Sequence, residues 1–461
     1  MALEEIVARK RVDVDERRRK TPLESFREEL NPSDRSLEGA LRASRTGFIM
    51  ECKRSSPSQG QIREDFDPGE IAGSYAPFAD AISVLTDEPY FEGRLEYLSV
   101  VRNVVDVPVL CKDFVVHPYQ VFEARRYGAD AILLMLSVLD DEMYGRCFEA
   151  ARELGMDVLT EVHDEDEVRR ALEHPSRPPI IGVNNRNLKT LKIDLSTTSR
   201  LAKLIPDARV VVCESGIGSH RDVVELRPHA DAFLVGTTLM RAENIDRAVR
   251  ELVFGSVKVC GLTRPEDALA AWQAGATLGG LIFATESPRA VTVEQARAIR
   301  SAAPLDFVGV FVNENVARVA EPADVLSLAA VQLHGEEGED YVAELRQALP
   351  ATTQIWQVHR VDESVPSVGS TGADRLLLDT FSAEKRGGTG HSFDWSLLGE
   401  RGQLDRFVLS GGLAPENAAR ADRVGVGMLD VNSGVESAPG IKDTRRLDQF
   451  FAALRGNGRD R

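Results

Sequence analysis

The sequence predicts an α/β protein made of two consecutive (β/α)8 barrels of the TIM type, preceded by an N-terminal helical extension. Short apolar runs alternate with amphipathic stretches through eight cycles, and the same alternation then begins again. The length of 461 residues also exceeds the size at which a single hydrophobic core stops growing. Together these two observations favour two barrel domains.

The chain opens with helical patterns rather than with a strand. Apolar residues recur at helical spacing from Leu3 onward. A second helix start is predicted at TPLE, where Thr21 would cap the helix, Pro22 suits its first position and Glu24 would close a capping box. We therefore expect a helical extension before the first strand.

Eight strand candidates follow this extension. They are the apolar runs that begin with FIMEC at 48, AISVL at 81, VPVLC at 107, AILLM at 131, MDVLT at 156, PIIGV at 179, ARVVVC at 208 and DAFLVG at 231. Between them lie amphipathic stretches such as residues 140–155, which have helical spacing and end at a glycine. The alternation predicts a closed parallel barrel.

The same pattern restarts at VKVCGL, residues 257–262. It continues through GGLIF, FVGVF, AVQLH, IWQV, RLLLD, RFVLSGG and GMLDVNSG. Because a helical run ends at Gly255, we predict a first domain over residues 1–254 and a second over residues 256–461. An open doubly wound sheet would also alternate strands and helices, but it gives no reason for polar residues at nearly every strand end.

Composition and charge restrict the classes of function. A formal net charge of −17 disfavours binding to a phosphate backbone, so we expect no nucleic-acid partner. The five cysteines are dispersed, without a C-x-x-C pair or a histidine cluster at metal-ligand spacing, so we expect no metal. No apolar run is long enough for a signal-peptide core or a membrane span. These features predict a cytoplasmic protein with no role at a membrane.

Charged and polar residues end most strands of the first predicted barrel. Glu51 and Lys53 lie two positions apart and therefore share one face of their strand. Buried charges are costly unless they serve each other or a ligand. The other strand ends carry Lys112, Glu161, Asn184, Arg186 and Glu214. Any one of these could be a solvated charge at the rim, but the set together indicates a catalytic centre at the carboxyl ends of the strands.

A phosphate site is predicted after the last two strands of this barrel. The segments CESGI and LVGTT supply Gly216, Gly236 and Thr237, whose backbone N–H groups could approach a phosphate closely. Each segment alone is only a weak turn signal.

Taken in order, ECKRSSPS, VLTDEPYFEG, CKDF, LTEV, GVNNRNL, ESGI and LVGTTLM resemble indole-3-glycerol-phosphate synthase over essentially all of residues 1–254. The resemblance implies a carbon–carbon lyase that closes the ring of 1-(2-carboxyphenylamino)-1-deoxyribulose 5-phosphate, with loss of carbon dioxide and water. It implies that Lys112 is the general acid at the substrate carbonyl and that Glu161 assists dehydration. How proton transfers divide between Lys53 and Lys112 stays open.

The same resemblance implies roles for further residues. Glu51 and Asn184 would position and stabilise the intermediate, Lys53 would contact the phosphate region, and Phe91 would pack by the aromatic ring. The remaining candidates of this site are Glu214 as a catalytic residue, Ser56, Phe114, Arg186 and Ser215 as substrate-binding residues, and Gly216, Gly236 and Thr237 as phosphate-binding residues.

In the second predicted barrel, Cys260 ends the first strand and Asp379 ends the sixth. A lone buried cysteine is usually only a small hydrophobic residue. Here, however, the two side chains could present a base and an acid to one small sugar. A phosphate site is again predicted after the last two strands, at Gly411, Gly412, Ser433 and Gly434.

The motifs VCGLTRPEDA, GLIFATESPRAV, VQLHG, LLLDT, GGTG, LSGGL and NSGVESAPGIKD resemble phosphoribosylanthranilate isomerase from residue 256 to the C-terminus. The resemblance implies an aldose–ketose isomerisation of N-(5-phosphoribosyl)anthranilate, an Amadori rearrangement that needs no cofactor. Asp379 would protonate the ring oxygen, Cys260 would remove the C2 proton as a thiolate, and Arg289 would hold the anthranilate carboxylate. His334 could bind substrate or be only a hydrogen-bonded histidine at a strand end.

The predicted isomerase makes the substrate of the predicted synthase, so the C-terminal domain would act first. A free cysteine needs electropositive help to act as a base near neutrality, and the sequence does not identify this helper. One alternative is a pair of other phosphate-binding barrels, such as sugar-phosphate epimerases, and the set of Lys112, Glu161 and Glu51 argues against it. Another is a non-catalytic double barrel that binds phosphometabolites, which would have lost acids and bases that this chain keeps. We expect a monomer that acts on small phosphorylated substrates.

Overall fold

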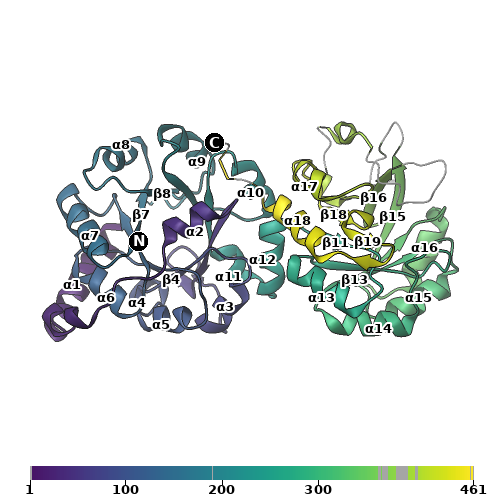
Figure 1. Ribbon diagram of the computed structural model, residues 1–461, viewed down its shortest axis with the longest axis horizontal. Helices are drawn as coiled ribbons and strands as arrows, with labels where there is room; N and C mark the ends of the chain where they lie inside the picture. Colours follow the sequence, from purple (N-terminus) through teal and green to yellow (C-terminus); the bar gives the residue numbers. More distant parts are fainter. Residues whose placement is uncertain are drawn as a thin grey trace. The chain divides into compact units, whose positions relative to one another are not determined.

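The structure is a computed structural model that describes residues 3–188, 190–361, 365, 372–380, 393–399, 403–456 and 458–459. The chain forms two compact units (Figure 1). The first runs to Val249 and also includes the residues that follow Gly456, and the second covers Arg250–Gly456. Each unit contains a closed barrel of eight parallel strands, which confirms the predicted fold class.

The first barrel has the strand order β1-β10-β9-β8-β7-β6-β5-β4. Its strands are β1 (Gly47–Cys52), β4 (Ala81–Leu85), β5 (Val109–Lys112), β6 (Ala131–Met135), β7 (Asp157–Val162), β8 (Ile180–Asn184), β9 (Val210–Glu214) and β10 (Ala232–Val235). Each overlaps one of the eight predicted apolar runs. Almost every strand residue is buried, because helices cover the outside of the barrel and side chains fill its inside.

The helices of the first unit include the predicted helix within residues 140–155. They are α1 (Leu3–Lys20), α2 (Leu37–Ala43), α3 (Pro68–Tyr75), α4 (Glu88–Phe91), α5 (Glu96–Arg102), α6 (Tyr119–Arg126), α7 (Asp141–Glu153), α8 (Glu165–Glu173), α9 (Ser196–Leu201), α10 (His220–Leu226), α11 (Thr237–Arg241) and α12 (Ile245–Phe254), which continues into the second unit. A small hairpin of β2 (Ser55–Ser56) and β3 (Gly60–Gln61) follows β1, and 3-10 turns span Leu23–Ser25, Arg27–Glu29 and Ala202–Leu204.

The capping box predicted at TPLE is wrong. The backbone N–H of Thr21 donates to the carbonyl of Arg17 at 2.8 Å, so Thr21 completes the end of α1. Pro22 takes the N-cap position of a short 3-10 turn over Leu23–Ser25, and no side chain caps this turn. Only three residues are then helical before the chain turns at Phe26, whose side chain is buried.

The second barrel has its strands in sequential order. They are β11 (Val257–Val259), β12 (Leu278–Ile282), β13 (Asp306–Phe311), β14 (Ala330–Leu333), β15 (Gln354–Val361), β16 (Arg375–Thr380), β17 (Phe407–Leu409) and β18 (Met428–Val431). All eight overlap the predicted runs. The GGTG motif at residues 387–390 lies outside the described residues.

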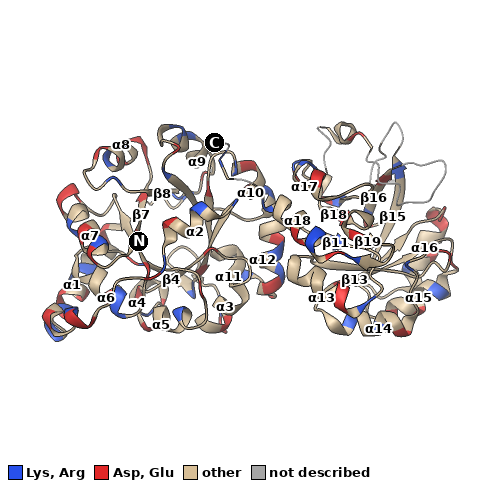
Figure 2. Cartoon of the chain, viewed as in Figure 1, with Lys and Arg blue, Asp and Glu red and all other residues tan. Residues whose placement is uncertain are grey.

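Helices between these strands complete the second unit. They are α13 (Pro265–Ala274), α14 (Val293–Ala302), α15 (Val316–Val325), α16 (Glu339–Ala348), α17 (Pro415–Asp422) and α18 (Thr444–Arg455), with 3-10 turns at Trp395–Leu398, Leu404–Arg406 and Ser433–Val435. A hairpin of β19 (Glu436–Ala438) and β20 (Ile441–Lys442) follows β18. Figure 2 shows charged residues of both signs mainly on the helices. Across the part of the chain that the structure describes, no helix is long and apolar enough to cross a bilayer.

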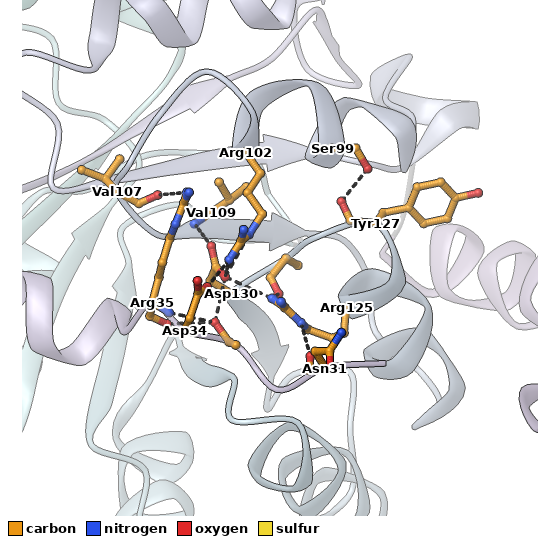
Figure 3. A network of polar contacts seen from close by, with 12 residues as sticks. Asn31, Asp34, Arg35, Ser99, Arg102, Val107, Val109, Arg125, Tyr127 and Asp130 are labelled. Atoms are coloured by element: carbon orange, nitrogen blue, oxygen red, sulfur yellow. Dashed lines mark hydrogen bonds and ion pairs between the residues drawn. The ribbon is translucent and has the colours of Figure 1, made fainter. Parts of the chain in front are cut away.

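Asp130, which directly precedes β6, is the centre of a polar network that attaches the N-terminal segment to the first barrel (Figure 3). Its carboxylate accepts hydrogen bonds from Arg102 at 3.0 Å, Arg125 at 3.1 Å, Ser33 at 2.7 Å and the backbone N–H of Val109 at 3.1 Å. Asp130 is completely buried, so these donors replace the water that its charge loses on folding. The network lies at the amino-terminal ends of the strands and leaves the carboxyl ends open for chemistry.

Asp130→Asn should destabilise the protein strongly, because it leaves two arginines without the buried charge that they pair with. We expect a loss of about 3–5 kcal/mol in the free energy of unfolding, measured by urea denaturation. Asp34→Asn is the matched control, since the Asp34 side chain binds the same Arg102 but is 76% exposed. This control should lose less than about 1 kcal/mol. Equal losses in the two variants would contradict the role given to Asp130.

Candidate active sites

The first barrel contains a cavity of about 320 Å³ at the carboxyl ends of its strands. Its lining includes every candidate that the sequence predicted for this domain. These are Glu51, Lys53, Ser56, Phe91, Lys112, Phe114, Glu161, Asn184, Arg186, Glu214, Ser215, Gly216, Gly236 and Thr237. Residues far apart in the sequence meet here because parallel strands all end at the same rim of the barrel.

Lys112, the last residue of β5, lies between two carboxylates inside this cavity. Its Nζ is 2.7 Å from Oε2 of Glu214 and 3.1 Å from Oε2 of Glu161. Both carboxylates are almost fully buried, whereas the Lys112 side chain keeps 13% of its surface exposed. The ammonium group is therefore held by protein on one side and faces the cavity on the other.

The charges in this cluster shift the pKa of each member. Burial alone would lower the pKa of Lys112, but Glu214 and Glu161 raise it above its usual range. Burial alone would raise the pKa of Glu161, but Lys112 and His163 lower it below its usual range. Burial raises the pKa of Glu214, as does the charge of Glu161, although Lys112 opposes them. Lys112 thus keeps its proton, Glu161 stays ionised and Glu214 takes up a proton more readily than an ordinary glutamate.

A second ion pair joins Glu51 and Lys53, as the two-residue spacing on one strand suggested. Lys53 Nζ lies 2.6 Å from Oε1 of Glu51. Gly236 at the end of β10 makes room for this pair, because a Cβ at that position would come within 2.3 Å of the same Glu51 oxygen. Asn184 accepts a hydrogen bond from the backbone N–H of Arg186 at 2.9 Å, which fixes its amide at the cavity wall.

The predicted phosphate residues lie where the chain leaves β9 and β10. Ser215 and Gly216 adopt successive positive φ angles of 66° and 95°. Backbone N–H groups in a turn can form a concavity that suits an anion. Gly236 lies at the N-cap of α11, so Thr237 begins that helix. Both segments border the same cavity.

The sequence analysis missed His163. Its Nε2 lies 3.2 Å from Oε1 of Glu161 and its Nδ1 lies 3.1 Å from Oε2 of Glu167. Burial alone would lower the pKa of His163, but these two carboxylates raise it to about 10. The signal was present in the sequence, because His163 follows Glu161 by two positions and could share its face.

The helical extension also contributes to the first site, which the sequence did not predict. Leu3 and Ile6 of α1 line the cavity. Lys10, further along α1, is buried, and its Nζ lies 2.6 Å from both Asp87 and Asp113. Because Asp113 directly follows Lys112 in the chain, this pair of contacts anchors the helix beside the strand end that carries Lys112.

In the second barrel, Cys260 directly follows β11 and Asp379 lies near the end of β16, so both reach the carboxyl rim. Oδ2 of Asp379 is 3.6 Å from Nε2 of His334, and Nδ1 of His334 hydrogen-bonds with Gln332 at 3.1 Å. Gly411 has a φ of 81°, and a Cβ there would lie 2.7 Å from Oδ1 of Asp379. The glycine therefore allows the chain after β17 to approach Asp379 closely.

Arg289 follows β12 and forms a two-pronged ion pair with Glu436 on β19. Its Nε lies 2.9 Å from Oε1 of Glu436, and its Nη2 lies 2.6 Å from Oε2. Lys442 approaches the same carboxylate at 2.9 Å and donates to the side chain of Asn432 at 3.1 Å. A Cβ at Gly261, directly after Cys260, would lie 2.7 Å from Cδ of Arg289, so this cluster borders the cysteine.

The remaining phosphate candidates follow β17 and β18. Gly412 has a φ of 65° and its carbonyl accepts a hydrogen bond from Asn417 at 2.8 Å. Ser433 and Gly434 begin a 3-10 turn, and a Cβ on Gly434 would lie 1.9 Å from the carbonyl oxygen of Leu413. The two loops therefore pack directly against each other. No group of three or more potential metal ligands occurs within the described ranges.

Comparison with known proteins matches one family to each barrel. Residues 3–252 match the family described as indole-3-glycerol phosphate synthase, and residues 257–453 match the family described as N-(5'-phosphoribosyl)anthranilate (PRA) isomerase. The "Tryptophan biosynthesis protein TrpCF" of Vibrio cholerae is 52% identical over 96% of this chain and 93% of its own length. Proteins of the same name from Salmonella typhi and Haemophilus influenzae are 49% and 44% identical, over 98% and 97% of this chain and 99% and 96% of their own lengths.

The family matches cover nearly the whole chain, and the relatives align with both barrels together. The chain belongs to the family of bifunctional tryptophan-biosynthesis enzymes in which an indole-3-glycerol phosphate synthase is followed by a phosphoribosylanthranilate isomerase.

Proposed function

We propose that the second barrel isomerises N-(5-phosphoribosyl)anthranilate and that the first barrel closes the ring of the product, acting as a carbon–carbon lyase. The observation that carries the first assignment is Lys112, a protonated ammonium held by two carboxylates and open to the cavity. The observation that carries the second is the presence of Cys260 and Asp379 at the rim of one barrel. Each reaction consists of proton transfers and bond rearrangements that side chains can assist.

In the first barrel, Lys112 acts as the general acid. The aromatic carbon that bears the carboxylate attacks the ketone carbon, and the ketone oxygen takes a proton from Lys112. Carbon dioxide then leaves, and its bonding electrons restore the aromatic ring. In the following dehydration the hydroxyl takes a proton from solvent and leaves as water, and Glu161, which its surroundings keep ionised, accepts the proton lost from the neighbouring carbon. Exchange with solvent then returns Lys112 and Glu161 to their starting protonation states.

The other residues of the cavity bind the substrate. Phe91 and Phe114 have ring centroids 6.1 Å apart and would contact the aromatic ring of the substrate. The backbone around Gly216 and Gly236 would hold the phosphate. Glu51 and Asn184 would position the intermediate, and Lys53 would contact the phosphate region. His163 positions Glu161 rather than touching the substrate.

In the second barrel, Asp379 protonates the ring oxygen of the sugar, which opens the furanose and leaves an iminium group. Cys260 as a thiolate then removes the proton from C2, and the resulting enol becomes the ketose. The Nε–Nη2 edge of Arg289 binds Glu436, so the substrate carboxylate would bind its Nη1–Nη2 edge. His334 beside Asp379 would help to bind the substrate, and the phosphate would lie at Gly411, Gly412, Ser433 and Gly434.

We further propose that the protein acts as a cytoplasmic monomer, and that neither reaction uses a cofactor. All five cysteines are free and buried, which is compatible with a reducing compartment. Light scattering of the purified protein tests the oligomeric state.

Substitution of Lys112 should separate the two activities. Lys112→Met should lower kcat for ring closure by about 10²- to 10⁴-fold, because it removes a general acid, and should leave isomerisation intact. Lys20→Met is the control, since Lys20 is an exposed lysine of the same domain that pairs with Glu16 and does not line the cavity. Indole absorbance measures the first activity, and loss of anthranilate-type fluorescence measures the second. Equal loss of ring closure in both variants would contradict the acid role of Lys112.

Substitution of the cysteine should have the opposite effect. Cys260→Ala should abolish isomerisation of phosphoribosylanthranilate, yet leave ring closure of separately supplied carboxyphenylamino-deoxyribulose phosphate unchanged. Cys213→Ala is the control, because this cysteine is also buried but lies within strand β9 of the first barrel. A folded wild-type protein that converts neither substrate would refute both assignments and favour a binding role.

The raised pKa of His163 predicts a pH-dependent stability. A group whose pKa is higher in the folded than in the unfolded state stabilises the fold fully below its unfolded pKa of about 6.5. This stabilisation is lost as the pH rises through the folded value of about 10. His163→Asn should therefore lower the midpoint of thermal unfolding more at about pH 6 than at about pH 10. A difference from wild type that does not change with pH would contradict the ion pairs of His163.

A further inference from the structure

A buried ion pair inside the second barrel has no assigned role. Nζ of Lys258 on β11 lies 2.9 Å from Oδ1 of Asp430 on β18, and the two residues are direct partners in the strand register. The Lys258 side chain is completely buried and that of Asp430 is 5% exposed. A buried pair of charges is often no more stabilising than apolar residues of similar volume. Its presence in a barrel core therefore suggests a use beyond stability.

Lys258 is a neighbour of Cys260. The two residues are separated by one position, so they point to the same side of the strand, toward the inside of the barrel. Gly280 on β12 shows how close they come. A Cβ built on this glycine would lie 2.7 Å from Sγ of Cys260 and 3.0 Å from Cε of Lys258. The absence of a side chain at Gly280 leaves the space in which the sulfur and the end of the lysine chain lie together.

We propose that Lys258 is the cation that stabilises the thiolate of Cys260, and that Asp430 holds its ammonium group beside the sulfur. The proposal rests on the proposed role of Cys260 as the base of the isomerase. When the thiolate forms, the thiol releases its proton to solvent. It then takes the proton of substrate C2 and becomes a thiol again, while Lys258 keeps its own proton throughout.

The surroundings of the sulfur support this arrangement. Burial raises the pKa of Cys260, and the charge of Lys258 is the largest influence that lowers it. Asp430 acts in the opposite direction, and Lys442 on β20 lowers the pKa less than Lys258 does. The negative charge of the ionised sulfur also raises the pKa of Arg289. Among these groups Lys258 has the strongest effect in favour of the thiolate.

The neighbouring cations are less suited to this task. Lys442 and Arg289 share the carboxylate of Glu436, and Lys442 also binds Asn432. Asp430 additionally accepts a weak hydrogen bond at 3.4 Å from Ser410, which directly follows β17. The ammonium group of Lys258 is thus bound by Asp430 on one side and lies beside the sulfur of Cys260 on the other.

The test is a titration of the Cys260 thiol by its ultraviolet thiolate absorbance. Each variant is compared with the same protein carrying Cys260→Ser, so that only this sulfur contributes to the difference. The double variant Lys258→Met with Asp430→Asn removes both charges together and leaves no unpaired buried ion. We expect the pKa of Cys260 to rise by about one unit or more, which corresponds to about a tenfold smaller thiolate fraction below the pKa. The rising limb of the isomerase pH profile should move in the same direction.

Two further variants make the result decisive. Lys442→Met is the matched control, because it removes another buried ammonium of the same barrel, and it should shift the thiol less. Lys258→Gln alone should also raise the pKa of Cys260, because the cation is lost while the opposing carboxylate of Asp430 keeps a hydrogen-bond donor and remains in place. A purely structural pair would leave the thiol pKa unchanged in both variants. If the double variant does not fold, the single variant decides, and an unchanged or lowered pKa there would overturn the proposal.

The outcome also separates this inference from the proposed function. If the titrations shift as expected but Cys260→Ser keeps isomerase activity, the electrostatic role of Lys258 stands and the base assignment fails. If Cys260→Ser abolishes activity and the double variant leaves the thiol pKa unchanged, Lys258 is not the stabilising cation. An equal shift in Lys442→Met would likewise overturn the inference.

Discussion

The chemistry of the first barrel depends on one interaction, the ammonium of Lys112 held between the carboxylates of Glu161 and Glu214. An isolated charge in this position would be very costly to bury, and a lysine there would lose its proton. Two carboxylates from the alternate strands β7 and β9 keep the proton in place without blocking the open side of the cavity. The strands fix these distances, because β5, β7 and β9 all end at the same rim.

The second barrel uses the same principle for a different reaction. Its base is a thiol, whose charged form is negative, and burial therefore opposes ionisation. Lys258 and Asp430 form a fixed dipole in the barrel wall with its positive end toward the sulfur. Arg289 and Lys442 form a separate charged cluster around Glu436 near the opening. In both barrels, ion pairs between different strands hold the charges that catalysis needs.

The sequence predicted the strands and most of the first site because both follow local rules. Each strand is an apolar run of the right length, and its last residues fall at a common rim whatever the rest of the fold does. The helix start at TPLE was predicted wrongly because α1 continues to Lys20, so that Thr21 completes this helix through a bond to Arg17 instead of capping a new one. Lys10 and Lys258 were missed because their partners are distant in the sequence. His163 lies only two positions from its partner Glu161 and could have been predicted from that spacing. The pairing of Lys258 with Asp430 joins positions 172 residues apart.

The claim that one chain carries two independent sites acting in sequence has a direct test by complementation. Purified Lys112→Met and Cys260→Ala proteins are each supplied with phosphoribosylanthranilate, separately and then mixed, and indole-3-glycerol phosphate is measured. The account predicts that neither variant alone forms the final product and that the mixture does, because the product of one isomerase can diffuse to the intact synthase of the other protein. Failure of the mixture of folded variants, or full conversion by either variant alone, would contradict it.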